Sequence, residues 1–312
     1  MRRIFIVTPA GAGTRSGNRH TALRWAALLR GAGHRVRVAL AWQGENCDAL
    51  IALHARRSHS SIARFRRDCP GKRLIVVLTG TDLYRDLPES AEARESLRFA
   101  DRLVVLQDEA LRALDPRMRR KTRVVFQSAD PKLSPAPPHD RFRVAVVGHL
   151  RAEKDPLRAV AALQHLPGEK IELIQVGTAL DAALGKEASG WMAREARYRW
   201  LGGLPHRRAL GWIARSHLLV VSSVMEGGAN VIAEAARIGT PVIASRVPGN
   251  IGMLGRGYPG FFPLGDEVAL SQLIARAAAD RRFLGSLRKA LRKRRKRFAP
   301  AAERAALIAA VR

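Results

Sequence analysis

The chain has 312 residues, which is long for one domain and enough for two domains with a core each. It carries 55 Lys and Arg against 27 Asp and Glu, a net charge of +28, so we expect anionic substrates or partners. Two cysteines without a CxxC or Cys/His cluster indicate neither a disulfide framework nor a zinc site, and no stretch approaches the ~18 apolar residues of a membrane span.

Short apolar runs alternate with helical patterns along the first 126 residues. This alternation predicts an α/β domain with a parallel, doubly wound sheet and helices on both faces. The expected strands are 4–8, 36–41, 50–53, 74–78, 103–106 and 124–126.

The first expected strand leads into a glycine-rich loop and a helix with an apolar stripe. Gly17 and Asn18 fall where a first helical turn exposes N–H groups, and Arg15 and Arg19 add positive charge. A small anion can dock on such a group of donors. The loop has neither GxGxxG spacing with a downstream acid nor GxxxxGK[ST], so it predicts neither a dinucleotide site nor a P-loop.

Two later strand ends carry polar groups that we expect to face an acceptor substrate. They are His54, Arg56 and Arg57 after one strand, and Thr79, Gly80, Thr81 and Asp82 after the next. The alternative interpretations are an exposed arginine pair and an aspartate that caps the following segment.

A proline-rich segment then interrupts the pattern. Residues 127–140 hold four prolines and no periodic apolar signal, which predicts an interdomain linker. The pattern restarts with expected strands at 144–147, 171–176, 198–201, 218–222 and 241–245. We place two Rossmann-like domains at 1–135 and 136–298, facing each other across a cleft, and expect the helix 299–312 to pack back on the first.

Cations gather at the first strand end of the second domain. Gly148 is followed by His149, Arg151 and Lys154. Preorganised cations there can stabilise a leaving group such as a diphosphate, whose negative charge grows in the transition state of a transfer reaction. Lys154 is the best candidate, and the alternative is a solvated lysine in a helix-entry loop.

Two glutamates separated by seven residues bracket a glycine pair after the strand 218–222. Gly227, Gly228 and Ala229 open a helix whose unpaired N–H groups and dipole can hold an anion or sugar hydroxyls. Glu226 lies at that opening, and Glu234 lies about two turns further on the same side, where a carboxylate can accept both hydroxyls of a ribose. Two glutamates on a surface helix are also common, but the strand end favours a ligand site. The pattern indicates a nucleotide-sugar.

The segment 281–297 has ten basic residues in seventeen, no acid, and apolar positions at helical spacing. Such a helix can lie on anionic lipid or RNA, or be a solvated face packed on its domain by leucines. No Asp-x-Asp pair occurs anywhere, so we expect no metal and no other cofactor. A reducing cytoplasm fits the cysteine count.

These motifs together resemble family 4 glycosyltransferases of the GT-B fold. The resemblance implies that Lys154 contacts the donor diphosphate, that Glu226 lies by the transferred sugar, and that Glu234 holds the ribose. It assigns the remaining donor-binding positions to His149, Arg151, Gly227, Gly228, Ala229, Asn230 and Val231. The chain departs from the family at His149, where an arginine is usual, and at Thr79, where a histidine is common.

Several longer segments, among them VVGHLRAEKDP, LIVVLTGTDLYRDL and EGGANVIAEA, are similar to the selenosugar synthases of selenoneine biosynthesis. That resemblance implies hexosyl transfer from UDP-GlcNAc or UDP-glucose to selenophosphate, forming a carbon–selenium bond and releasing UDP and phosphate. A soft, ionised selenium nucleophile needs no general base, which agrees with the loss of the histidine. The alternatives are a transferase acting on a lipid or small alcohol at a membrane surface, and a non-catalytic basic protein that binds RNA or membrane.

Overall fold

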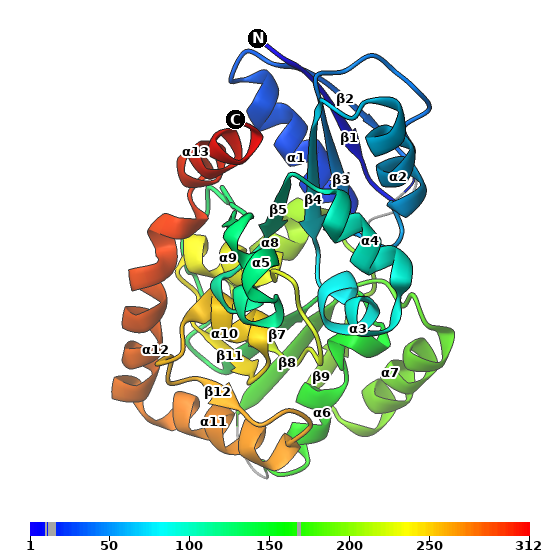
Figure 1. Ribbon diagram of the computed structural model, residues 1–312. Coiled ribbons are helices and arrows are strands. Elements are labelled where there is room, and N and C mark those ends of the chain that lie inside the picture. The colour runs from blue at the N-terminus through cyan, green and yellow to red at the C-terminus, as the bar shows by residue number, and fades with distance from the viewer. Residues whose placement is uncertain (10, 12–16, 167–169) are drawn as a thin grey trace. The chain divides into compact units, whose positions relative to one another are not determined.

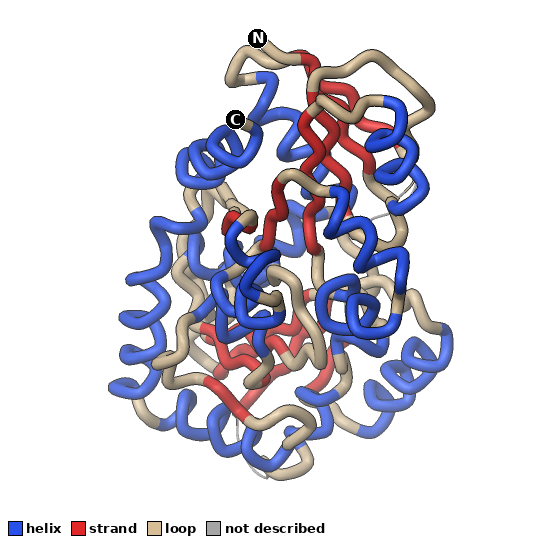
Figure 2. Tube along the Cα trace, in the orientation of Figure 1, coloured by secondary structure: helices blue, strands red, loops and turns tan. Residues whose placement is uncertain are grey.

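The computed structural model describes residues 1–9, 11, 17–166 and 170–312 (Figure 1). The chain divides into two compact units: residues 1–128 with 300–312, and residues 129–299. Each unit contains one parallel six-stranded sheet, which confirms two doubly wound α/β folds (Figure 2). The division follows Ser128, whereas the sequence suggested a boundary after residue 135.

The first unit alternates strands with short helices. Its sheet has the order β2-β1-β3-β4-β5-β6, so the chain reverses direction across the sheet between β1 and β3. The elements are β1 (Arg3–Val7), α1 (Gly17–Arg30), β2 (Arg35–Ala39), β3 (Ala49–Leu53), α2 (His59–Asp68), β4 (Arg73–Leu78), the π-helix η1 (Asp82–Asp86), α3 (Leu87–Glu89), α4 (Ala91–Phe99), β5 (Arg102–Val105), the 3-10 helix η2 (Asp108–Ala113), α5 (Pro116–Arg120), β6 (Thr122–Val124) and α13 (Pro300–Val311).

Helices cover both faces of this sheet. Side chains of α1 and α13, such as Trp25 and Leu307, share one apolar cluster with Ile51 of β3, while Ile62 of α2 and Leu97 of α4 belong to the cluster on the other face. Figure 1 shows α1 with α13 on one side and α2 with α4 on the other. Alternate residues of each strand therefore enter different cores, which explains why the central strands are continuously apolar.

A buried carboxylate fixes α13 to the rest of the first unit. Glu303, which is 1% exposed, accepts the indole N–H of Trp25 at 2.7 Å and the backbone N–H of Ser128 at 2.9 Å. Its other contacts are the guanidinium of Arg24, at 3.0 Å, and the hydroxyl of Ser128, at 2.5 Å. A buried charge with this many partners specifies where the helix docks.

The second unit repeats the alternation. Its sheet has the order β12-β11-β10-β7-β8-β9, so the direction reverses between β7 and β10. The elements are β7 (Phe142–Val147), the 3-10 helix η3 (Ala152–Lys154), α6 (Arg158–Leu163), β8 (Ile171–Val176), α7 (Ala182–Arg194), β9 (Tyr198–Trp200), α8 (His206–Ala214), β10 (Leu218–Val221), α9 (Asn230–Ile238), β11 (Val242–Ser245), α10 (Pro248–Leu254), β12 (Phe261–Phe262), α11 (Glu267–Ala279), α12 (Arg281–Arg294) and the 3-10 helix η4 (Arg295–Phe298).

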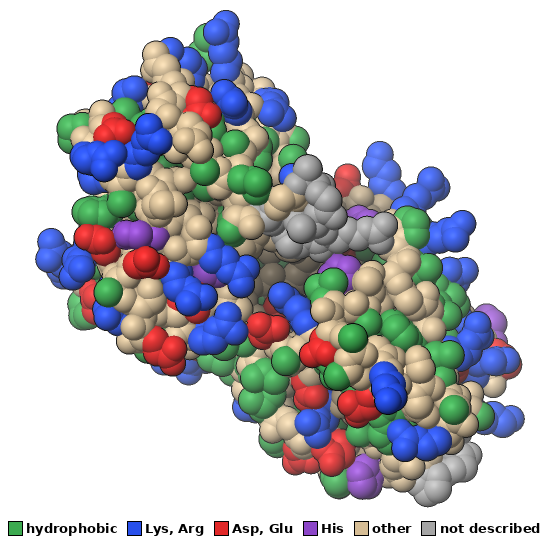
Figure 3. Space-filling model, turned by 90° about the vertical axis from the view of Figure 1, so that its right-hand side faces the viewer, with side chains coloured by type: hydrophobic (Ala, Val, Ile, Leu, Met, Phe, Trp, Pro, Cys, Tyr) green, Lys and Arg blue, Asp and Glu red, His purple; other side chains and the backbone are tan. Residues whose placement is uncertain are grey.

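The basic segment 281–297 is a helix packed on its unit by apolar side chains. The buried residues of α12 are Phe283, Leu284, Leu287 and Leu291, and Arg294 donates to the carbonyl oxygens of Gly252 and Met253 at the end of α10. Most of the other cations of the segment are exposed. Figure 3 shows Lys and Arg scattered over the face in view, with Asp and Glu among them.

Candidate functional site

The second sheet presents its loops at a topological switch point. Strands β7 and β10 are parallel neighbours, and the chain leaves them toward opposite sides of the sheet. Open α/β sheets bind ligands in the crevice beyond the carboxyl ends of such strands. The loop after β7 carries Lys154 and the loop after β10 carries Glu226, so two of the residues singled out in the sequence meet here.

Lys154 and Glu226 form a direct ion pair. Lys154 Nζ donates to Glu226 Oε1 at 2.5 Å, and the hydroxyl of Ser223 donates to the same oxygen at 2.7 Å. The glutamate side chain is 7% exposed and the lysine side chain 24% exposed. Both contacts use Oε1, and within the described residues no contact to Oε2 is present. The pair thus combines a partly accessible ammonium with a carboxylate oxygen that is open to a ligand.

Backbone contacts hold the two loops together. The Ser222 hydroxyl donates to the carbonyl oxygens of Lys154 at 3.1 Å and Asp155 at 2.7 Å. The N–H of Val224 donates to Glu153 O at 3.0 Å. Asp155 adopts φ 41°, a left-handed conformation that is rare outside glycine and ends the turn carrying Lys154. Backbone contacts therefore fix the loop that carries Lys154, which limits where its ammonium group can lie.

A second layer of contacts fixes Glu226 from α10. The Ser245 hydroxyl donates to the carbonyl oxygen of Ser223 at 2.5 Å, and the amide of Asn250 donates to Ser245 O at 3.0 Å. Asn250 and Ser245 are fully buried. A polar chain thus runs from α10 through Ser245 and Ser223 to the Glu226 carboxylate, and nothing in the sequence pattern had indicated it.

The helix α9 begins at Asn230, three residues later than the glycine pair suggested. Gly227, Gly228 and Ala229 lie in the loop before it, and the N-cap residue Ala229 has no side-chain oxygen to accept the first N–H groups. Val231 lies in the first turn. A helix N-terminus without a capping side chain is suited to binding phosphate or hydroxyl groups.

Glu234 lies on α9, and its side chain is 14% exposed. His206, the first residue of α8, places its Nε2 2.7 Å from Glu234 Oε1. The sequence had singled out the glutamate but not the histidine, because these residues are far apart in the chain and come from different helices.

The other predicted donor-site residues with basic side chains, His149 and Arg151, lie in the loop after β7. His149 is half-buried and Arg151 is exposed, and Arg151 O accepts the N–H of Lys154 at 2.9 Å. A Cβ on Gly177 would come within 1.8 Å of Gly148 O, so only glycine allows the loops after β7 and β8 to pack this closely. Arg151 makes no ion pair within the part of the chain that the structure describes.

The first sheet has a comparable switch point between β1 and β3. Gly17 and Asn18 begin α1 after β1, with Arg19 next to them, and the loop after β3 carries Arg56 and Arg57. Arg15 lies outside the described residues. The predicted acceptor residues Gly17 to Arg19 and Arg56 to Arg57 thus belong to loops at the same edge of one sheet.

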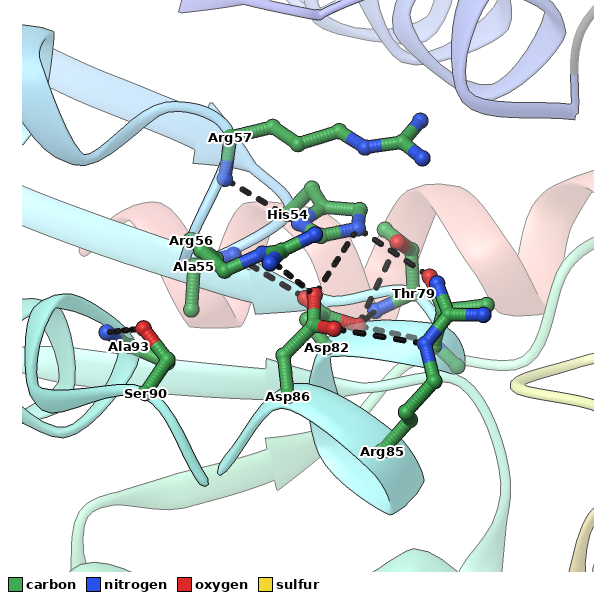
Figure 4. Close-up of polar contacts among 12 residues, drawn as sticks. His54, Ala55, Arg56, Arg57, Thr79, Asp82, Arg85, Asp86, Ser90 and Ala93 are labelled. Carbon is green, nitrogen blue, oxygen red and sulfur yellow. Dashed lines mark hydrogen bonds and ion pairs between the residues drawn. The ribbon is translucent and has the colours of Figure 1, made fainter. Parts of the chain in front are cut away.

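Asp82 holds the backbone together rather than facing a ligand (Figure 4). It is fully buried, and its Oδ1 accepts the N–H groups of Thr79 at 2.8 Å and Gly80 at 2.9 Å. Its Oδ2 accepts the N–H of Ala55 at 3.0 Å. Direct contact of this aspartate with an acceptor does not fit this geometry, because backbone donors already occupy both oxygens. Its effect is to join the loops after β3 and β4.

His54 occupies a strained position at the end of β3. Its φ is 73° although it is not glycine, and it is 1% exposed. Its Nδ1 accepts the N–H of Arg57 at 3.3 Å, so the ring proton is on Nε2, which lies 3.1 Å from Thr81 Oγ1 and 3.7 Å from Asp86 Oδ2. Burial lowers the pKa of His54, and the negative charge of Asp82 opposes this shift. The ring is accordingly neutral at pH 7.

The two neighbouring arginines have different partners. Arg56 Nε lies 3.1 Å from Asp86 Oδ2, and Arg85 Nε lies 3.4 Å from the other oxygen of that carboxylate, whose side chain is 3% exposed. Arg57 is exposed and pairs with no carboxylate in the described part of the chain. Figure 4 shows its guanidinium directed away from Asp86. Asp86 itself was missed in the sequence, since an aspartate in a polar turn carries no distinctive signal.

The described residues contain no group of three or more His, Cys, Asp or Glu arranged to hold a metal ion. Among the same residues, no helix combines the length and the apolar character needed to cross a bilayer.

Comparison with known proteins identifies a family for this chain and several solved structures with a similar fold. Residues 131–302 match the family model described as glycosyl transferases group 1. Among solved structures, the chain is similar to a sucrose-phosphate synthase from Thermosynechococcus elongatus, with a TM-score of 0.80 and 18% identity over 98% of this chain and 97% of the other.

Two further structures share the fold. A UDP-forming α,α-trehalose-phosphate synthase from Burkholderia vietnamiensis gives a TM-score of 0.69 and 14% identity over 84% of this chain and 71% of the other. TarM of S. aureus, a G117R mutant in complex with fondaparinux, α-GlcNAc-glycerol and UDP, gives a TM-score of 0.67 and 12% identity over 84% of this chain and 55% of the other.

Proposed function

Because the chain belongs to the group 1 glycosyl transferases, we propose that it moves a hexosyl group from a UDP-sugar to selenophosphate and is a selenosugar synthase. Family and fold make it a glycosyltransferase of the GT-B type. The donor and acceptor are our proposal. The observation that carries it is the Lys154–Glu226 pair at the switch point of the second sheet.

The donor assignment rests on the groups around that pair. Breaking the bond between the anomeric carbon and the diphosphate oxygen leaves UDP with an added negative charge, which Lys154 and Arg151 would stabilise. Glu226 would bind the transferred sugar through Oε2, and Glu234 the ribose. The trehalose-phosphate synthase is UDP-forming and the TarM structure is a complex with UDP, which supports a uridine donor. The sugar that we propose is GlcNAc or glucose.

The acceptor assignment rests on the first unit and on the resemblance to selenosugar synthases. Arg57 has no acidic partner in the described residues, and the start of α1 at Gly17 and Asn18 adds N–H groups, so a small, multiply charged anion suits this edge of the sheet. Thr79 replaces the usual histidine, which agrees with an already ionised selenium nucleophile.

The reaction balances with one water molecule. Selenium attacks the anomeric carbon as the bond to the UDP oxygen breaks, which gives a hexosyl selenophosphate and UDP. Water then cleaves the phosphorus–selenium bond, leaving phosphate and a hexosyl selenol. No electrons are gained or lost overall, so no redox partner is needed.

The test is to incubate pure protein with UDP-GlcNAc or UDP-glucose and selenophosphate in EDTA, following UDP release and product mass. Lys154→Ala is the loss-of-function variant, and Lys186→Ala, on an exposed position of α7, is its matched control. A selenium-containing sugar formed by wild type and Lys186→Ala, and absent with Lys154→Ala, supports the proposal. UDP release without selenium in the product would overturn the acceptor alone.

A rival assignment is a transferase acting on a lipid or small alcohol at a membrane. The exposed cations of α12 favour it, because each Lys or Arg near an anionic bilayer contributes ~1 kcal/mol. Sedimentation with vesicles of phosphatidylserine separates the two. Binding that is lost when the α12 cations are replaced by Gln, together with UDP release dependent on an alcohol acceptor, would favour the rival.

A further inference from the structure

A hydrogen bond between His206 and Glu234 joins two helices at the proposed nucleoside end of the donor site. His206 Nε2 donates to Glu234 Oε1 at 2.7 Å. The imidazole is 60% exposed, whereas the carboxylate is 14% exposed. The pair is therefore open on the histidine side and sheltered on the glutamate side.

The backbone of His206 has little conformational freedom. It is the first residue of α8, directly after Pro205, whose ring fixes its own backbone torsion. The helices α8 and α9 pack against each other, so the histidine approaches Glu234 from a neighbouring helix. Both helices follow strands of the same parallel sheet, β9 and β10, and their N-terminal ends lie at the edge that carries Glu226.

One carboxylate oxygen of Glu234 thus accepts the hydrogen bond from His206, and the other oxygen does not. The hydrogen bond from His206 uses Oε1, and within the described residues no hydrogen bond or ion pair to Oε2 is present. A carboxylate that recognises a ribose diol must offer acceptor positions in a fixed direction. A hydrogen bond to a ring with only two side-chain torsions holds that direction at a small entropic cost.

We propose that His206 is a positioning residue of the nucleoside subsite, which orients Glu234 toward the ribose hydroxyls of the donor. This inference rests on the proposed function, since it assumes that Glu234 binds the ribose. It adds a residue from α8 to a site otherwise built from the loops after β7 and β10 and from α9. It also predicts that recognition of the 2′-hydroxyl depends on a side chain outside the pair formed by Glu226 and Glu234.

The competing explanation is a surface ion pair with no role in binding. Exposed pairs contribute little to stability, and removal of a pair with no role in binding leaves ligand affinity unchanged. The two explanations differ in what they predict for discrimination between a ribonucleotide and its 2′-deoxy analogue.

The experiment is calorimetric titration of the full chain with UDP and with 2′-deoxy-UDP. The variants are His206→Ala, His206→Gln, whose amide can still donate to Glu234, and Glu234→Ala. The control is Arg207→Ala, the adjacent exposed cation, which removes a charge but no contact to Glu234. Thermal unfolding of each variant checks that it is folded.

We expect His206→Ala to weaken UDP binding about tenfold, the loss of one charge-assisted hydrogen bond, and to reduce the preference for UDP over 2′-deoxy-UDP. His206→Gln should restore most of both, and Arg207→Ala should retain both. In turnover, His206→Ala should raise KM for the UDP-sugar and leave kcat nearly unchanged, because the change is remote from the reacting carbon.

Two failures are distinguishable. If Glu234→Ala abolishes discrimination between the two nucleotides while His206→Ala retains wild-type affinity and preference, this inference is wrong and the donor assignment stands. If Glu234→Ala binds both nucleotides as wild type does, the ribose assignment itself is wrong, and the role of His206 falls with it.

Discussion

Gly249 at the start of α10 stands directly against Glu226. A Cβ built on Gly249 would lie 2.0 Å from the carbonyl oxygen of Glu226 and 2.5 Å from its Cβ. Both partners are atoms fixed to the backbone, which cannot turn aside as the end of a side chain can. The absence of a side chain at residue 249 is therefore a condition for the position of the Glu226 carboxylate.

Gly249→Ala should displace Glu226 and slow glycosyl transfer. A shift on the order of 1 Å in a catalytic group can lower the rate by ~10²-fold, so we expect a loss of about 10- to 100-fold in kcat/KM for the UDP-sugar. Gly257→Ala is the matched control, because a Cβ there meets nothing within 4 Å. Equal activities of the two variants would contradict the argument.

Variants of the Lys154–Glu226 pair should affect stability and activity differently. Lys154→Ala leaves a nearly buried carboxylate without its ammonium, so we expect lower thermal stability and a fall of about 10²- to 10³-fold in kcat. The double variant Lys154→Met, Glu226→Leu removes both charges and should recover stability but not turnover. Recovery of turnover in the double variant would show that neither group acts on the substrate.

Arg57 and Arg56 should differ as acceptor residues. Arg56 is bound to Asp86, whereas Arg57 pairs with no carboxylate in the described residues, so Arg57→Ala should raise the acceptor KM about tenfold or more. Arg56→Ala should mainly lower stability, since it leaves Asp86 with fewer partners. Steady-state kinetics at saturating UDP-sugar, with selenophosphate varied, measures the difference, and a larger KM effect at Arg56 would reverse our assignment.

His54 should make stability depend on pH. Its pKa is lowered in the folded state, so below about pH 6.5 the unfolded chain binds more protons than the folded one. The contribution of His54 to the free energy of unfolding is fully present above about pH 6.5. It is lost as the pH falls below that value, by at most ~1.4 kcal/mol per pH unit. His54→Asn keeps a residue that tolerates positive φ and does not titrate.

Urea unfolding between pH 7.5 and 5.5 measures the effect. We expect the free energy of unfolding to decline less steeply with falling pH for His54→Asn than for wild type. His34 and His217 also have pKa values lowered by burial, so part of the decline should persist in the variant. Identical slopes would contradict the argument, because they would mean that His54 has the same pKa in the folded and the unfolded chain.

Glu303 should be essential to the docking of α13. Glu303→Ala leaves the Trp25 indole and the Ser128 N–H without their acceptor, and each unsatisfied buried group costs about 1–3 kcal/mol. The midpoint temperature of thermal unfolding should fall by several degrees. Glu187→Ala, at an exposed position of α7, should leave that temperature unchanged. Faster hydrogen exchange in α1 of the Glu303 variant would identify the first unit as the part that loosens.

The fold was largely predictable because its signal is local. Buried parallel strands such as 74–78 are continuous apolar runs, and the structure has strand β4 at Arg73–Leu78. Strand β12, Phe261–Phe262, was missed because two residues between a glycine and a proline carry no period. The start of α9 was placed too early, since glycines in a loop and glycines in a first helical turn look alike in sequence.

The site was predictable only where a residue type is unusual for its position. Lys154 and Glu226 were singled out because each follows an apolar strand, whereas their direct contact at 2.5 Å was not expected. Asp82 was taken for a ligand contact, but burial makes it a backbone acceptor. Asp86 and His206 act through pairings with Arg56 and Glu234 that are distant in sequence, and a single sequence contains no record of such pairings. Ser223 and Asn250 have nearer partners, but a serine or asparagine near a strand end has no distinctive signal.

The docking of α13 has a consequence for biosynthesis. The apolar face that α1 and the sheet of the first unit offer to Leu307 and Val311 is covered only after residues 300–312 have left the ribosome. Residues 129–299 are translated in the interval, so the second unit can fold while that face is still uncovered. Exposed apolar surface of this kind is where nascent chains aggregate or bind chaperones, so the time needed to translate those intervening residues sets how long the first unit is vulnerable.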